Sequence, residues 1–149
     1  MAIKSMKFRH KLFYLPVFGE LLLIEMRQRF DDVDSLVPVP LHRWRQALRG
    51  FNQALELATF IGRDTGLPIM GNIRRIRSTK TQSGLTADER KRNLKGAFAV
   101  TGKLRFRRPL IIDDVMTTGE TCNQLAGTLL SAGAEKVYVL TIARANPKN

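Results

Sequence analysis

The 149-residue sequence contains a single cysteine, Cys122, and two histidines, His10 and His42. One cysteine excludes an intrachain disulfide and a cysteine-based zinc site, and the two histidines are too far apart in sequence to indicate a metal site. No apolar run reaches the length that a membrane span needs. The basic start, residues 1–7, is not followed by a clean signal-peptide core. We therefore expect a cytoplasmic protein.

Acidic residues are also scarce, because 13 Asp and Glu stand against 25 Lys and Arg, which gives a net charge of +12. Such an excess favours polyanionic partners, since contacts with phosphates are attractive and release counterions. The charge does not identify the partner by itself, because single-stranded DNA and a phosphorylated sugar would both be attracted. Both classes of ligand stay open at this point.

The length is that of about one domain, which we place at residues 1–149, with an N-terminal helical segment at 1–35 and a core at 36–145. Apolar spacing and turn residues predict alternating helices and strands. The helices are expected at 14–30, at 54–64 and from 119 or 120 onward, and the strands at 36–39, 68–70, 97–100, from 110, and 136–142. This alternation predicts an α/β fold in which helices cover both faces of a parallel sheet.

The most informative segment is residues 110–121, Leu-Ile-Ile-Asp-Asp-Val-Met-Thr-Thr-Gly-Glu-Thr. Its apolar run predicts a buried strand, and Asp113 and Asp114 would stand at the carboxyl end, where open α/β sheets bind ligands. The two carboxylates would there accept hydrogen bonds from sugar hydroxyls. The following turn would surround a phosphate with N–H groups and hydroxyls under the positive end of the next helix. This turn extends from Met116 to Thr121.

Each piece of this segment also has an ordinary structural interpretation, because aspartates cap helices and Thr-Gly is a common turn. We favour a ligand site, since a dozen positions carry the required residue types in the required order. Cys122, in the first turn after the loop, is most simply a small apolar helix residue, although a helix N-terminus can lower the pKa of a thiol.

Two basic stretches precede this segment. Residues 40–53 carry Arg43, Arg45 and Arg49 between an expected strand and an expected helix. This arrangement suits a diphosphate, because guanidinium groups bind phosphate oxygens in pairs, and an exposed basic loop is the alternative. Residues 74–86 are basic and polar without a sustained period, and a helical stretch that holds Arg90 and Arg92 is expected to follow at 87–95. They would form a mobile cationic loop over a site, a nucleic-acid-binding surface or an exposed loop.

From about residue 4 onward the sequence resembles the ComF/GntX family, phosphoribosyltransferase-like proteins linked to DNA uptake and use. The matching motifs are Val-Pro-Val-Pro-Leu at 37–41, Arg-Gly-Phe-Asn-Gln at 49–53, Gln82 with Arg-Asn-Leu-Lys-Gly-Ala-Phe at 92–98, and the type I phosphoribosyltransferase signature at 109–121. Arg-Gly-Phe-Asn-Gln at this distance before the signature is specific, because general phosphoribosyltransferases lack it. One departure is the absence of the four-cysteine zinc ribbon that family members usually carry before this domain.

The resemblance implies the type I phosphoribosyltransferase fold, an open, mostly parallel five-stranded sheet flanked by helices. It also implies 5-phosphoribosyl 1-diphosphate as the ligand, bound with Mg²⁺. Asp113 and Asp114 would then hold the ribose hydroxyls, and the loop at 117–121 would hold the 5′-phosphate.

An enzyme of this kind, a pentosyltransferase, displaces diphosphate from the C1 carbon of ribose through an oxocarbenium-like transition state, so negative charge builds on the diphosphate. Arg45 and Arg49 would bind the diphosphate, and Arg90 and Arg92 would stabilise it as it leaves. Three functions remain open: a phosphoribosyltransferase of nucleotide salvage acting on a base, a competence or DNA-utilisation protein that keeps the ligand site, and a structural adaptor. The intact acid pair argues against the adaptor, and the basic clusters favour the DNA-handling protein.

Overall fold

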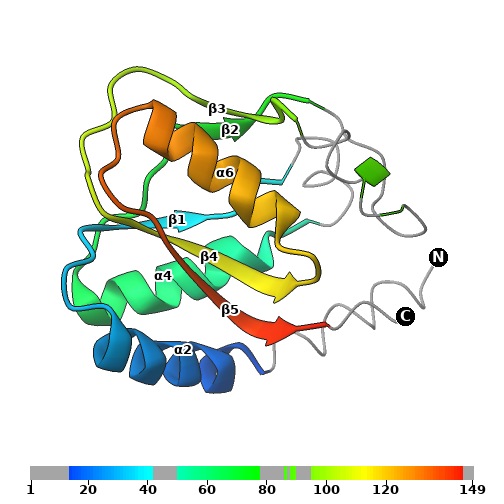
Figure 1. Ribbon diagram of the computed structural model, residues 1–149. Coiled ribbons are helices and arrows are strands. Elements are labelled where there is room, and N and C mark those ends of the chain that lie inside the picture. The colour runs from blue at the N-terminus through cyan, green and yellow to red at the C-terminus, as the bar shows by residue number, and fades with distance from the viewer. Residues whose placement is uncertain (1–13, 42–49, 78–85, 87, 90–94, 146–149) are drawn as a thin grey trace.

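The computed structural model describes residues 14–41, 50–77, 86, 88–89 and 95–145 (Figure 1). Among these residues the helices are α2 (Leu15–Arg29), α4 (Gln53–Thr65) and α6 (Glu120–Ser131). The strands are β1 (Ser35–Pro38), β2 (Ile73–Arg75), β3 (Phe98–Val100), β4 (Pro109–Met116) and β5 (Tyr138–Arg144).

A parallel sheet in the order β1-β4-β5 forms the centre of the fold. On the other side of β1, Leu36 pairs with Ile69 in a single parallel bridge. The N–H of Leu36 donates to the Pro68 carbonyl at 2.8 Å, and the N–H of Met70 donates to the Leu36 carbonyl at 2.9 Å. The bridge stays short because Pro68 has no N–H to donate and Gly71 follows. β2 and β3 form a separate antiparallel pair.

The α/β architecture with a parallel sheet is confirmed, but the five expected strands do not all join one sheet. Within the described residues the parallel sheet has three strands and the bridge at Ile69. The prediction of an irregular basic loop from Arg74 onward is wrong at its start, where β2 runs to Arg75. Arg75 is buried there because its guanidinium carbon lies 5.6 Å from the centre of the Phe98 ring, a cation–π contact.

The last strand begins two residues later than expected. The N–H groups of Glu135 and Lys136 both donate to the Arg107 carbonyl, at 2.8 and 3.2 Å, and this keeps the segment in a turn. β5 therefore starts at Tyr138 and continues to Arg144.

Helices cover both faces of the parallel sheet (Figure 1). α2 and α4 lie on one face, where Ile61 packs with Leu110 and Ile112 of β4. α6 and the β2–β3 pair lie on the other face, where Leu125 packs with Ile111. Because side chains alternate along a strand, β4 contributes to both cores, and its apolar run ends where the acidic residues begin.

α4 begins and ends at residues that also position its neighbours. Asn52 Oδ1 accepts a hydrogen bond from the N–H of Ala54 at 3.1 Å, which caps the helix. Asn52 Nδ2 donates to the Val39 carbonyl at 3.1 Å, so the same side chain ties the start of α4 to the chain just after β1. Gly66 ends the helix with φ of +73°, in the left-handed region that glycine favours.

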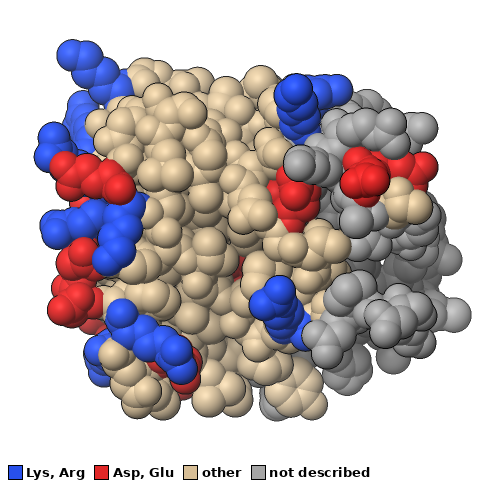
Figure 2. All heavy atoms as spheres, viewed as in Figure 1, with Lys and Arg blue, Asp and Glu red and all other residues tan. Residues whose placement is uncertain are grey.

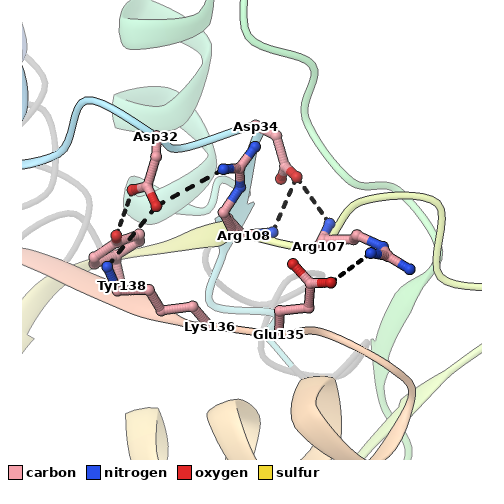
Figure 3. A network of polar contacts seen from close by, with 7 residues as sticks. All are labelled: Asp32, Asp34, Arg107, Arg108, Glu135, Lys136 and Tyr138. Atoms are coloured by element: carbon pink, nitrogen blue, oxygen red, sulfur yellow. Dashed lines mark hydrogen bonds and ion pairs between the residues drawn. The ribbon is translucent and has the colours of Figure 1, made fainter.

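A charged network joins the elements at the other end of β4, where the strand begins (Figure 3). Asp34 accepts hydrogen bonds from the backbone N–H groups of Arg107 and Arg108 at 2.8 and 3.0 Å. The hydroxyl of Tyr138 donates to Asp32, and this hydrogen bond, with basic side chains nearby, lowers the pKa of Asp32. Figure 2 shows acidic and basic side chains interleaved along this edge, on its left.

Candidate functional site

The connections that leave β1 and β4 run to opposite sides of the sheet. From β1 the chain passes through α4 to Ile69, which pairs outside β1, and from β4 it passes through α6 to β5. The carboxyl ends of β1 and β4 therefore form the topological switch point, where open α/β sheets have their ligand crevice. In Figure 1 this is the end toward which the β4 arrow points, beside the start of α6.

Asp113 and Asp114 stand at this end of β4, the position that the sequence predicts. Asp113 Oδ1 accepts a hydrogen bond from the N–H of Asp114 at 2.9 Å, and its Oδ2 lies 3.9 Å from Cys122 Sγ. Asp114 Oδ1 accepts from the N–H of Val115 at 2.9 Å, and its carbonyl accepts from the Thr141 hydroxyl at 3.2 Å. The backbone thus orients both carboxylates, whose remaining lone pairs accept further hydrogen bonds.

Burial, together with the negative charge of Asp114, raises the pKa of Asp113 to about 7. Burial and the nearby Asp113 carboxylate also raise the pKa of the Cys122 thiol to about 12. Cys122 is therefore a protonated, buried helix residue, as its simplest interpretation predicts. Asp113 titrates near neutral pH, so a ligand that needs its carboxylate form would bind in a pH-dependent manner.

The turn after β4 and the first turn of α6 enclose a hollow of about 30 Å³. Its lining includes all five residues that the sequence assigns to a phosphate site, Thr117, Thr118, Gly119, Glu120 and Thr121. Gly119 has φ of +80°, and a Cβ there would lie 3.4 Å from Met116 Sδ. The hollow has about the volume of one water molecule, so a phosphate would occupy its mouth, at the positive end of α6.

A second hollow, of about 40 Å³, opens on the β1 side of the acid pair. Asp113 and Asp114 line it together with Phe51, Asn52 and Gln53. The two specific motifs of the sequence, which are far apart along the chain, therefore meet at one point in space. Because Asp113 lines both hollows, they adjoin each other, one at the start of α6 and the other at the start of α4, and we call the pair the crevice.

A cavity of about 510 Å³ adjoins the second hollow through Leu41 and Asn52, which line both. Its walls combine apolar residues such as Ile73 with the basic residues Arg74 and Arg75. Sequence reasoning missed this cavity because it treated the segment from Arg74 as an irregular loop, whereas strand β2 forms one wall.

Four residues predicted for the site lie outside the described residues: Arg45, Arg49, Arg90 and Arg92. Their roles stay predictions. Among the described cations, Arg74 lines the large cavity beside the crevice, and Arg144 pairs in register with Met116 at the end of β4. Sequence reasoning missed Arg144, since it ended the last strand at 142.

Within the described part of the chain, no group of three or more His, Cys, Asp or Glu side chains is placed to hold a metal ion. Proteins often bind Mg²⁺ through one or two carboxylates and substrate phosphates rather than through such a group. The crevice, with two carboxylates beside the loop that the sequence predicts to bind phosphate, fits Mg²⁺ that arrives on a diphosphate. No described helix has the length and apolar character that a membrane crossing requires.

Known proteins are similar to this chain over nearly its whole length. It is 34% identical to competence protein F of Haemophilus influenzae, in an alignment that covers 97% of this chain and 67% of that protein. It is 36% identical to DNA utilization protein YhgH of Escherichia coli, over 95% of this chain and 65% of that protein. Competence protein ComFC of Streptococcus pneumoniae is 29% identical, over 93% of this chain and 60% of that protein. The chain thus spans about two thirds of the length of these relatives.

Solved structures establish the fold. A purine phosphoribosyltransferase from Pyrococcus horikoshii superposes with a TM-score of 0.54 at 16% identity, over 89% of this chain and 73% of that one. The allosteric regulatory enzyme of purine biosynthesis superposes with a TM-score of 0.55 at 18% identity, over 84% of this chain and 24% of that one. A comparison with protein-family models finds no match. The identity to competence protein F, over most of both chains, shows that this chain belongs to the ComF family, and its fold is that of the type I phosphoribosyltransferases.

Proposed function

We propose that this chain binds 5-phosphoribosyl 1-diphosphate, as its Mg²⁺ complex, in the crevice at the carboxyl end of β4. The observation that carries the proposal is that Asp113 lines both the hollow at the phosphate loop and the hollow at the start of α4. A ligand anchored in the loop by its 5′-phosphate would present its ribose hydroxyls to Asp113 and Asp114. Its C1 carbon and diphosphate would then extend toward the β1 side.

Backbone dipoles and hydroxyls would provide the phosphate site. The N–H groups at the start of α6 carry partial positive charge, and Thr117, Thr118 and Thr121 supply hydroxyl donors. The diphosphate carries more negative charge than these groups can neutralise. It therefore needs cationic side chains, and Arg45 and Arg49 would supply them. Both precede residues 51–53, which line the second hollow, and Arg49 is the first residue of the Arg-Gly-Phe-Asn-Gln motif.

In a transfer reaction, the bond between C1 and the diphosphate oxygen breaks, and a nucleophile forms a bond to C1. The acid pair would stabilise the positive charge on the sugar, and Arg90 and Arg92 would stabilise the departing diphosphate. Mg²⁺ supplies further neutralisation of that diphosphate. Nucleotide salvage, with a free base as the nucleophile, is the alternative role, and the 510 Å³ cavity is large enough for a base.

Calorimetric titration with the Mg²⁺ complex of 5-phosphoribosyl 1-diphosphate tests the ligand. The wild type should bind at one site, and Asp113→Ala/Asp114→Ala should weaken binding at least about a hundredfold, because charge-assisted hydrogen bonds to the ribose are lost. Asp31→Ala is the matched control, since it removes an exposed carboxylate at the opposite end of the fold. Equal affinities of the double variant and the wild type would contradict the proposal.

We further infer that the site serves DNA uptake or use, with single-stranded DNA contacted by basic residues. The net charge of +12 supports this role, as do the names of the relatives, competence protein F and DNA utilization protein. The charged edge at the start of β4 is a poor candidate for the contact, because acids are interleaved with bases there (Figure 2). Basic residues beside the crevice, such as Arg74, are better candidates.

Binding of a single-stranded oligonucleotide across a salt series tests the DNA contact. About three phosphate contacts would give a slope of about −2 for the logarithm of the binding constant against the logarithm of salt concentration. Arg74→Ala should make this slope shallower by about 0.7, the contribution of one contact. Arg63→Ala, an exposed arginine near the end of α4, is the charge-matched control. A flat slope for the wild type would contradict the DNA contact and would leave 5-phosphoribosyl 1-diphosphate as the one proposed ligand.

A further inference from the structure

α2 carries a stripe of apolar side chains on its outer surface. Tyr14, Val17, Leu21 and Ile24 are 53%, 57%, 54% and 50% exposed. Their spacing of three, four and three residues is that of the a and d positions of a coiled coil, which fall on one side of a helix. We call these four residues the α2 stripe.

The α2 stripe does not belong to the core of the fold. The buried side of α2 consists of Gly19, Leu22, Leu23 and Met26, which are half a turn away on the helix. The helix is therefore apolar on both sides, whereas a surface helix of a monomer carries one apolar side. Figure 1 shows α2 as the outermost described element on its side of the sheet. An exposed apolar row of this kind marks an interaction surface.

The charges beside the stripe favour a second copy of the same helix as its occupant. Glu20 and Arg27 lie on one flank at coiled-coil g positions, and Glu25 lies on the other flank at an e position. In a parallel pair, Glu20 would face Glu25 of the other copy, and the two would repel. In an antiparallel pair centred between Leu21 and Ile24, Glu20 would face Arg27 of the other copy. The pattern is thus self-complementary in the antiparallel arrangement.

We propose that two copies of this chain associate through their α2 stripes, packed antiparallel about a two-fold axis. Leu21 of each copy would then pack against Ile24 of the other, which is the self-matching contact of a two-fold interface. Arg27 already contacts Asp64 of its own chain, but the two side chains are 65% and 42% exposed, so its guanidinium remains accessible to a second carboxylate. One helix face is a small interface, so association would be weak.

Sedimentation equilibrium of the whole chain tests the proposal. The wild type should dimerise at protein concentrations on the order of 100 µM, and Leu21→Glu should weaken dimerisation by about a hundredfold, because it places two charges at the centre of the interface. Leu130→Glu is the matched control, since Leu130 is 48% exposed on α6, outside the stripe. Thermal unfolding followed by circular dichroism establishes that both variants are folded.

A charge exchange tests the antiparallel arrangement. Glu20→Arg should weaken dimerisation by about tenfold, because the new arginine of each copy would face Arg27 of the other copy, which gives two repulsive pairs in each dimer. The double variant Glu20→Arg/Arg27→Glu should restore dimerisation, since it restores both opposite-charge pairs. Failure of the double exchange to restore dimerisation would overturn the arrangement. A wild type that stays monomeric to about 1 mM, or a Leu21→Glu variant that dimerises as the wild type does, would overturn the proposal.

Discussion

Replacing Asp113 by asparagine is expected to raise the free energy of unfolding at pH 8 by about 2–4 kcal/mol. In the folded protein, burial and the charge of Asp114 raise the pKa of Asp113 from 3.8 to about 7. The wild type therefore carries a partly buried, destabilising charge above pH 7. Asparagine keeps the shape of the side chain and still accepts the hydrogen bond from the N–H of Asp114, but it carries no charge.

The sign of the pH dependence follows from the order of these pKa values. Below about pH 4, Asp113 is protonated in both the folded and the unfolded chain, so it contributes no pH dependence. Between about pH 4 and 7 the unfolded chain loses this proton while the folded chain keeps it, and the stability of the wild type falls. Above about pH 7 the contribution is constant. The difference between Asp113→Asn and the wild type should therefore grow from near zero at pH 4 to its full value at pH 8.

Urea unfolding of both proteins between pH 4 and 8 measures this difference. Taking the difference removes the contributions of other acidic groups, such as Asp32, whose lowered pKa acts in the opposite direction. Asp31→Asn, which removes an exposed carboxylate at the opposite end of the fold, is the control. A pH-independent difference for Asp113→Asn would show that burial does not perturb this carboxyl. The same variant should bind the phosphoribosyl ligand weakly, and a gain in stability with a loss of ligand is typical of a residue retained for function.

The parts of the site that sequence could predict are those built from one continuous segment. The run from Leu110 to Thr121 encodes a buried strand, an acid pair at its end and a glycine turn before a helix, all within local interactions. The helix at Gln53–Thr65 could also be predicted from local sequence. Its ends are set by a residue that caps the first turn, Asn52, and by a glycine that adopts a left-handed conformation, Gly66. Local patterns thus located the crevice before any contact between distant residues was known.

The parts that sequence could not predict depend on partners far along the chain. Arg75 belongs to a strand because it pairs with Phe98 of β3, whose ring also contacts its guanidinium group, and no local pattern shows this. The raised pKa of Asp113 likewise depends on burial by packed helices. The large cavity was missed for the same reason, since one of its walls is β2, a strand that forms by pairing with the distant β3. Antiparallel pairing between Ile73 and Val100 leaves no periodic signal in strands of three residues.

Replacing Asp34 by alanine is expected to lower the free energy of unfolding by about 2–3 kcal/mol, or about 4–10 °C in Tm. Its Oδ2 accepts hydrogen bonds from the N–H groups of Arg107 and Arg108, and its Oδ1 accepts from the Ser35 hydroxyl at 3.1 Å. The N–H of Asp34 also donates to the Arg108 carbonyl at 3.2 Å. One carboxylate thus joins the start of β1 to the start of β4, and hydrogen bonds to an ionised acceptor are among the stronger ones (Figure 3).

The two ends of β4 should therefore respond in opposite ways. Asp34→Ala should lose stability but keep its affinity for the phosphoribosyl ligand, because the network lies at the end of the strand away from the crevice. Asp34→Asn should retain part of the stability, since its amide oxygen still accepts a hydrogen bond, and Asp31→Ala should change it by less than about 0.5 kcal/mol. Thermal unfolding and calorimetric titration of the same preparations measure both quantities. Loss of ligand affinity in folded Asp34→Ala would show that the strand ends are coupled, and that the position of the acid pair depends on this network.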